Sequence, residues 1–294
     1  MNWQWEHIAL YIIAPALFVG AVVYGLFFAE RKAPGDKKYQ VRFQLSNGNF
    51  KADNIRRGAS IIGSAGSGKT ESVIYNFLQH FSEYGFCGVI HDYKDFELTE
   101  MAYPLFKNKN LNFYTIAFDQ VHYRVNPIAP KYLPNEESVN EVSRVLMENL
   151  LEQNLSASTG GNKFFSDAVE GLLSGMIWKM KTAYPDCCTL PHIIALFQLV
   201  STKKLVAFLK SDLTARSMAS AFINGIESEK QTAGVKSTLA NAFKKISSQK
   251  LFYVLSKDEV PLDINHPEHP AVIALVNHPK YDGAYSPVIA MIMH

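Results

Sequence analysis

The hydrophobic pattern of the chain begins with residues 8–29, which contain no charged side chain. A helix of that length rises about 1.5 Å per residue and covers the ~30 Å hydrocarbon core of a bilayer. No Lys or Arg precedes the run, whereas Arg31, Lys32 and further basic residues follow it. A cleaved signal peptide has its basic residues in front, so we expect a retained single-pass anchor at residues 1–32, with the following residues in the cytoplasm. A buried helix of a globular core is the alternative interpretation.

The next hundred residues alternate between strand and helix patterns. Residues 37–50 alternate polar and apolar positions around Asn47-Gly48, which predicts a hairpin with its turn there. A short β-branched run, a glycine-rich loop, a periodic helix and a second apolar run follow at 59–62, 63–68, 69–84 and 86–91. Helix 97–106 and strand 111–118 repeat this order. Strands joined through helices predict an α/β fold with a parallel sheet.

The middle of the chain has helical periodicity throughout. The predicted helices cover residues 135–155, 164–182, 190–199, 202–209 and 228–247, with Asn135 and Ser228 as N-caps. The apolar run 271–276 then predicts a strand that rejoins the sheet. We therefore divide the chain into an anchor (1–32), the first part of an α/β domain (33–134), an inserted all-α domain (135–250) and a return to the α/β domain (251–294).

Composition and charge exclude several classes of protein. The chain has 294 residues and a formal net charge of +2, which excludes a globally polycationic nucleic-acid coat and a polyanionic chain. Its 3 cysteines include the adjacent pair Cys187 and Cys188. An odd number with that spacing suits neither a disulfide framework nor a four-ligand zinc site, so we expect reduced thiols.

The strongest chemical signal is the sequence from Gly63 to Thr70, GSAGSGKT, which fits G-x-x-x-x-G-K-[ST]. Glycines let successive backbone N–H groups turn inward around phosphates, and the helix N-terminus adds partial positive charge. Lys69 is expected to reach the β- and γ-phosphates of ATP, and the Thr70 hydroxyl to bind Mg²⁺. The whole loop is the predicted nucleotide site: Gly63, Ser64, Ala65, Gly66, Ser67, Gly68, Lys69 and Thr70. A glycine-rich connection that binds nothing is the alternative.

A carboxylate follows the predicted strand 86–91. Asp92 at this carboxyl end faces the ligand crevice of an α/β sheet, where it is a candidate to hold Mg²⁺ through water or to order the loop. An acidic surface turn is the alternative. Glu97 follows in the same segment, and a solvated carboxylate in the first turn of the next helix explains it as well as a functional role does.

Several segments together resemble a known family. An N-terminal apolar helix, GSAGSGKT, VIHDYKDFELT, Arg124-Val125-Asn126-Pro127-Ile128 and Asn162-Lys163-Phe164-Phe165 occur in the order found in type IV secretion coupling proteins of the TraG/TraD type. The resemblance covers most of the chain. The family often has Asp-Pro-Lys-Gly-Glu-Leu where this chain has Asp92-Tyr93-Lys94-Asp95-Phe96-Glu97-Leu98, and many members have two membrane helices.

The resemblance implies a P-loop RecA-like domain interrupted by an all-α domain, and a bacterial inner-membrane protein. It also implies ATP and Mg²⁺ as cofactors, a homo-hexamer, and transport of single-stranded DNA or a relaxase-DNA complex into the proteins of a secretion channel. Local charge is compatible with DNA contact, because residues 201–250 carry many lysines and few acids. Solvated helix faces are the better explanation of most of these lysines, since no aromatic residues interleave with them in a stacking pattern.

One expected element of a P-loop motor is missing. No apolar run ends in the Asp-Glu pair that holds Mg²⁺ through water and activates the attacking water, so we interpret the chain as the N-terminal part of a longer motor or a truncated product. Lys69 and Asp92 then remain the only candidate catalytic residues. Two alternatives stay open: another membrane-linked DNA pump, similar to FtsK, or a non-hydrolysing ATP-binding assembly protein.

Overall fold

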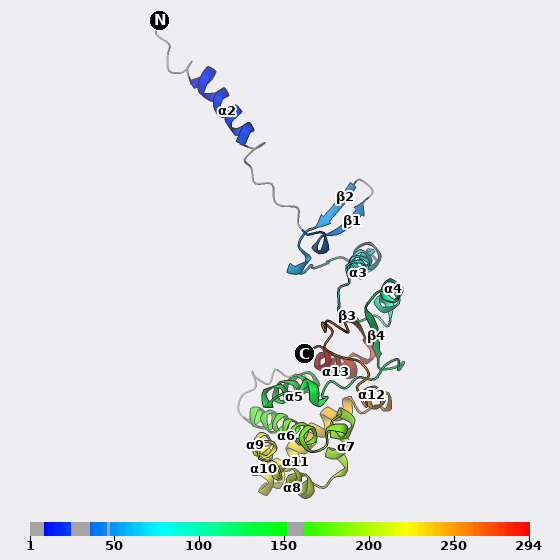
Figure 1. The fold of residues 1–294 in the computed structure, drawn as a ribbon. Helices are drawn as coiled ribbons and strands as arrows, with labels where there is room; N and C mark the ends of the chain where they lie inside the picture. Colours follow the sequence, from blue (N-terminus) through cyan, green and yellow to red (C-terminus); the bar gives the residue numbers. More distant parts are fainter. Residues whose placement is uncertain (1–8, 25–35, 46–47, 152–160) are drawn as a thin grey trace. The chain divides into compact units, whose positions relative to one another are not determined.

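The computed structural model describes residues 9–24, 36–45, 48–151 and 161–294. The chain, drawn in Figure 1, separates into two compact units, Met1–Asn76 and Phe77–His294. The boundary between them falls within helix α3 (Tyr75–Glu83). The domain boundaries expected from the sequence at residues 32, 134 and 250 stay predictions.

The apolar N-terminal run forms a π-helical turn, η1 (Ala9–Ile13), followed by helix α2 (Ala14–Val23). No side chain of α2 is buried, and Phe18 is 71% exposed. Within the described residues, no helix has both the length and the apolar character needed to span a membrane. The two ends of the predicted span 8–29 lie outside the described residues.

The predicted hairpin is confirmed, with its turn one residue earlier than expected. Strands β1 (Val41–Leu45) and β2 (Gly48–Ala52) pair antiparallel, and Leu45 is opposite Gly48. Residues 46–47, which connect them, lie outside the described part of the chain. Val41 and Phe43 are buried, and the Phe43 and Phe50 rings lie 5.8 Å apart between centroids. Two short 3₁₀ turns, η3 (Lys37–Tyr39) and η4 (Ile55–Arg57), flank the hairpin.

The strand expected at residues 59–62 is wrong. These residues have no regular secondary structure, and the side chain of Ile62 is 94% exposed. A β-branched run becomes a strand only when a neighbouring strand takes up its backbone hydrogen bonds, and 59–62 pairs with none of the described strands. After the glycine-rich loop the chain forms a π-helical turn, η5 (Thr70–Ile74), and helix α3 (Tyr75–Glu83).

The second unit contains a three-stranded parallel sheet. Strands β3 (Gly88–Asp92), β4 (Asn112–Ala117) and β5 (Ala271–Val276) lie in the order β3-β5-β4, so the strand that comes last in sequence is central. Asp92 and Ala117 are both in register with Val276. Every residue of β5 is buried, as its uninterrupted apolar sequence predicts. Helix α4 (Glu97–Phe106) connects β3 to β4 and packs on both.

The chain between β4 and β5 is helical, as predicted, and its regular helices are α5 (Glu136–Leu151), α6 (Gly161–Ala183), α7 (Leu190–Leu199), α8 (Thr202–Lys210), α9 (Leu213–Met218), α10 (Ser220–Asn224), α11 (Glu229–Lys245) and α12 (Gln249–Val254). Short 3₁₀ turns are η6 (Pro130–Tyr132), η8 (Pro185–Cys187) and η9 (Gly225–Glu227). Both predicted N-caps are confirmed, because Asn135 Oδ1 accepts from Ser138 N and Ser228 Oγ accepts from Gln231 N. Helices α9, α10 and α12 were not expected.

The sheet and the helices of the second unit share one hydrophobic core. Ile116 and Phe118 at the end of β4, and Ile273 and Leu275 of β5, belong to the same buried cluster as the helical residues. Helix α5 packs on α6 and on the C-terminal helix α13 (Asp282–Met293), which follows η10 (Pro279–Tyr281) (Figure 1). The helical insertion therefore does not have a core separate from the sheet.

Candidate phosphate-binding site

The glycine-rich loop curls around the ammonium group of Lys69. Lys69 Nζ donates hydrogen bonds to the carbonyl oxygens of Gly63 at 2.7 Å and Ser64 at 2.6 Å, and lies 3.5 Å from Ser67 Oγ. A turn is closed by the Ser67 N–H, which donates to Ser64 O at 3.3 Å. The loop thus already has the shape of a cradle, with the lysine at its centre.

Two glycines make this curvature possible. Gly66 and Gly68 have φ angles of +74° and +76°, in the left-handed region that other residues adopt at a cost. At Gly63 a Cβ would lie 2.8 Å from Ser67 Oγ, so the Ser67 hydroxyl would have to move to admit a side chain there. Loops that combine left-handed and right-handed residues direct successive N–H groups into one concavity, which is the geometry that binds phosphate oxygens.

The loop leads directly into a helical segment. Ser72 N donates to Gly68 O at 2.8 Å, and the helical turns from Thr70 continue into α3. Residues 61–67 are exposed, so an anion can approach the loop from solvent. The N-terminal end of a helical segment, a cationic side chain and an exposed glycine-rich loop together fit a polyphosphate group.

Asp92 ends strand β3 in a buried, hydrogen-bonded setting. It is fully buried, and its Oδ2 accepts hydrogen bonds from Thr99 N and Thr99 Oγ1, both at 2.8 Å, while Oδ1 accepts from Lys94 N at 3.2 Å. Thr99 lies in the first turn of α4, whose N-cap residue Phe96 has a φ of +73° and provides no side-chain cap. Asp92 therefore caps α4 from the preceding strand, and this arrangement fixes the helix against the sheet.

A second polar network lies at the same edge of the sheet and was missed by sequence reasoning. Asn277, fully buried at the end of β5, donates through Nδ2 to Asp282 Oδ1 at 2.8 Å and to Ser286 Oγ at 3.2 Å. Its backbone N–H donates to Asp92 O at 2.7 Å, and its carbonyl accepts from Asp95 N at 3.2 Å. The signal in the sequence is an Asn immediately after a buried strand, which does not by itself reveal its partners.

The segment Arg124 to Ile128, which carries part of the family resemblance, is structural in this fold. Asn126 Nδ2 donates to the carbonyl of Cys188 at 2.9 Å, and Val125 N donates to Val254 O at 2.8 Å. The Arg124 guanidinium pairs with Glu259, and the pKa of the Glu259 carboxyl falls to about 2 because Arg124 hydrogen-bonds to it. These contacts join the end of the sheet to the helices.

The structure places the predicted site residues in two groups. Gly63 to Thr70 belong to the unit Met1–Asn76, and Asp92 belongs to the unit Phe77–His294. Within the described residues, no strand is followed by an Asp-Glu pair: Asp92 precedes Tyr93, β4 is followed by Phe118-Asp119, and β5 by Asn277-His278.

The fold is similar to that of solved coupling-protein structures. The chain aligns with the bacterial conjugative coupling protein TrwBΔN70 in its unbound monoclinic form, with a TM-score of 0.60 and 13% identity over 92% of this chain. It has the fold of the conjugative coupling proteins. A trigonal TrwBΔN70 form in complex with sulphate and the plasmid coupling protein TrwB in complex with ADP and Mg²⁺ give TM-scores of 0.55 and 0.54, at 13% and 12% identity over 79% and 78% of this chain.

The aligned regions cover only part of each coupling-protein chain. This chain spans about half of the coupling-protein chains, because the aligned regions cover 56%, 48% and 48% of them. No protein-family model matches the sequence, and no curated protein is similar to it in sequence. The parallel sheet with its helices, expected from the sequence, is thus confirmed at the level of fold.

Proposed function

We propose that this chain is the nucleotide-binding part of a coupling-protein ATPase of conjugative DNA transfer. The observation that carries the proposal is the loop Gly63 to Thr70, with left-handed Gly66 and Gly68 and an inward-facing Lys69, in a chain with the coupling-protein fold. A complex of TrwB with ADP and Mg²⁺ is known, which supports ATP and Mg²⁺ as the cofactors.

The proposed roles follow from the geometry of the loop. Backbone N–H groups of residues 63–70 hold the phosphates, and Lys69 exchanges its two loop carbonyls for phosphate oxygens. Thr70, at the start of η5, is the proposed Mg²⁺ ligand. When bound, Mg²⁺ neutralises charge that develops on the phosphates. For Asp92, three hydrogen bonds and complete burial support a positioning role between β3 and α4 over direct metal contact.

Partners are proposed from the same comparison. TrwB is a conjugative coupling protein. By analogy, we propose that this chain acts on single-stranded DNA and a relaxase, contacts the proteins of the secretion channel, and assembles as a hexamer. Exposed lysines on the helices support contact with a phosphate backbone, namely Lys203, Lys204, Lys210, Lys230, Lys244 and Lys250. Lys236 contributes less, because its Nζ donates to Thr202 Oγ1 at 2.8 Å.

The anchor at residues 1–32 is proposed from the sequence and from the exposure of α2. An apolar helix with no buried side chain is stable in lipid and unfavourable in water. A reporter that is active only in the cytoplasm, fused after Lys51, should give a signal. A signal only from a periplasmic reporter contradicts the topology, and release of the full chain from membranes by salt alone contradicts the anchor.

The nucleotide proposal is tested by equilibrium binding of Mg-ATP to the full chain and to Lys69→Ala. We expect the variant to lose at least about tenfold in affinity, since charge-assisted contacts to phosphate are among the strongest hydrogen bonds. Lys51→Ala, an exposed lysine of the same unit, is the matched control and should bind as the parent does. Equal affinity of Lys69→Ala and the parent would show that the loop is only a structural connection.

Hydrolysis separates the motor from the non-hydrolysing alternative. Without an Asp-Glu strand in the described residues, we expect residues 1–294 to bind Mg-ATP and to release phosphate at close to the background rate, because general-base catalysis contributes about 10²–10⁴ in rate. Phosphate release is measured with and without single-stranded DNA. Brisk turnover that is lost in Asp92→Asn would assign Asp92 a catalytic role and contradict the positioning role proposed above.

A further inference from the structure

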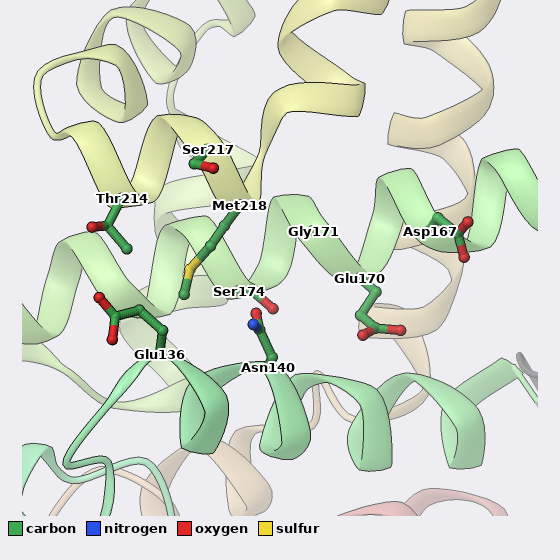
Figure 2. A pocket seen from close by; sticks show the side chains of 9 residues that line it. All are labelled: Glu136, Asn140, Asp167, Glu170, Gly171, Ser174, Thr214, Ser217 and Met218. Atoms are coloured by element: carbon green, nitrogen blue, oxygen red, sulfur yellow. The ribbon is translucent and has the colours of Figure 1, made fainter.

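The helical part of the second unit contains an acidic pocket that the nucleotide proposal does not use. It has a volume of about 490 Å³ and lies between α5, α6 and α9 (Figure 2). Its lining residues are Glu136, Asn140, Asp167, Glu170, Gly171, Ser174, Thr214, Ser217 and Met218. This volume is in the range of sites that bind small organic molecules.

The charge of the pocket is strongly one-sided. Glu136, Asp167 and Glu170 contribute carboxylates, and no lining residue is basic. None of the three carboxylates makes a hydrogen bond or an ion pair with the described part of the chain. Burial and the neighbouring Asp167 raise the pKa of the Glu170 carboxyl, against the opposing effect of Arg144. Arg144 does not neutralise the pocket, because it pairs with Glu141 and Glu148 on its own helix.

A second observation points independently to a ligand. Ser174 is 1% exposed, and its Oγ has no hydrogen-bond partner. Figure 2 shows this hydroxyl directed into the space between α6 and α5, toward Asn140. A buried hydroxyl without a partner costs free energy, so such a group in a native fold calls for an acceptor or donor that completes it.

The helices around the pocket pack closely against each other, which fixes the shape of the pocket. Gly171 and Gly175 of α6 face α9, and a Cβ at Gly171 would lie 2.4 Å from the carbonyl oxygen of Met218. The backbone of α9 therefore approaches α6 closely and holds Thr214, Ser217 and Met218 over the pocket (Figure 2). The lining residues come from rigid helices, which favours a fixed binding geometry.

The arrangement of the acids decides between classes of cation. Within the described residues, no cluster of His, Cys, Asp and Glu side chains is suited to hold a metal ion. Figure 2 shows Glu136 toward one end of the pocket, Glu170 and Asp167 toward the other, and Met218 with Ser174 between them. A ligand with two separated positive charges and an apolar middle matches this order better than a single compact ion does.

We propose that this pocket binds a linear aliphatic oligoamine, with one ammonium group at Glu136, another at Glu170 and Asp167, and its methylene chain along Met218. Where the oligoamine carries a further amine between its two ends, as spermidine does, the hydroxyl of Ser174 accepts a hydrogen bond from that N–H. The site is independent of the nucleotide loop, and its failure leaves the nucleotide proposal untouched.

The test is calorimetric titration of the full chain with spermidine, putrescine, n-butylamine and Mg²⁺, in the absence of nucleotide. We expect spermidine and putrescine to bind, and n-butylamine, with one charge, to bind at least about tenfold more weakly. Glu136→Gln and Glu170→Gln should each weaken spermidine binding about tenfold, because each removes a charge-assisted contact. Glu229→Gln, an exposed acid of α11 outside the pocket, is the matched control and should have no effect.

Several results would overturn the assignment. If n-butylamine binds as tightly as putrescine, the pocket does not recognise two separated charges. If Glu229→Gln weakens spermidine binding as much as Glu136→Gln does, spermidine responds only to the total charge of the protein. If an equal concentration of Mg²⁺ displaces spermidine, the acidic residues only attract cations non-specifically and do not form a specific binding site. Tighter binding of an arginine-containing peptide, lost in the same variants, would identify the pocket as a contact for protein side chains.

Discussion

Asp92 and Thr99 form a closed pair: the buried carboxylate of one receives both the backbone N–H and the hydroxyl of the other, each at 2.8 Å. The pair joins the carboxyl end of β3 to the first turn of α4. Because Phe96 cannot cap this helix, Asp92 supplies the acceptor that an N-cap side chain normally provides.

Thr99→Val removes the hydroxyl and nearly preserves the volume. We expect the free energy of unfolding to fall by about 1–3 kcal/mol, because a buried carboxylate loses one of its donors. Urea unfolding measures the change. Thr182→Val on α6 is the control, since its hydroxyl is exposed and it should change stability by less than about 0.5 kcal/mol. An equally small effect of Thr99→Val would mean that Asp92 does not depend on this hydroxyl.

Gly171→Ala tests the contact between α6 and α9. A methyl group 2.4 Å from the Met218 carbonyl forces the helices apart, so we expect a loss of about 1–3 kcal/mol, typical of overpacking. Gly283→Ala in α13 is the matched control, because nothing lies within 4 Å of its Cβ position. There the higher helix propensity of Ala predicts equal or greater stability. If both variants behave alike in thermal unfolding, the close approach of the helices does not exist.

The Arg124–Glu259 pair predicts acid sensitivity. The pKa of the Glu259 carboxyl is lowered from its ordinary 4.5 to about 2, mainly by the hydrogen bond from Arg124. A lowered pKa in the folded state means that the contribution of the pair is complete above about pH 4.5 and is lost as the pH falls toward 2. Urea midpoints from pH 2 to 6 should therefore decline less steeply in Glu259→Gln than in the parent.

Salt provides the control for that experiment. Both side chains of the pair are partly exposed, so added salt should weaken its contribution. Glu229→Gln, which removes an acid that is not part of the pair, should follow the pH profile of the parent. Identical profiles for Glu259→Gln and the parent would show that the pair does not contribute to stability.

Cys188 should resist alkylation in the folded protein. Its side chain is fully buried, its thiol donates to Ile128 O at 3.3 Å, and burial raises its pKa to about 12. Thiolate is the reactive form, so iodoacetamide should modify Cys188 only after unfolding, whereas the partly exposed Cys87 and Cys187 should react in the native state. Mass spectrometry of the alkylated peptides separates the three sites, and rapid native labelling of Cys188 would contradict the packing of this segment.

Much of the local structure follows from the sequence. Helix α4, helix α7 and strand β5 begin and end where periodicity and capping residues place them, because these signals act within a few neighbouring residues. The same holds for the N-caps Asn135 and Ser228, and for the pairing of the hairpin, although its turn lies one residue earlier than expected. The short helices α9, α10 and α12 were not expected, since segments of 5–6 residues carry too little periodicity and are stabilised mainly by the core they pack on.

The candidate phosphate site was identified by sequence alone, because its function depends on a contiguous loop whose glycines set the backbone locally. The setting of Asp92 was decided by tertiary structure: Thr99 of α4 donates to its carboxylate, and Asn277, which donates to its carbonyl oxygen, lies far along the chain, directly after β5. The strand expected at 59–62 was lost for the same reason, because a strand requires a partner that sequence pattern cannot supply. Likewise, only packing brings Glu136, Ser174 and Met218 from three helices around one acidic pocket.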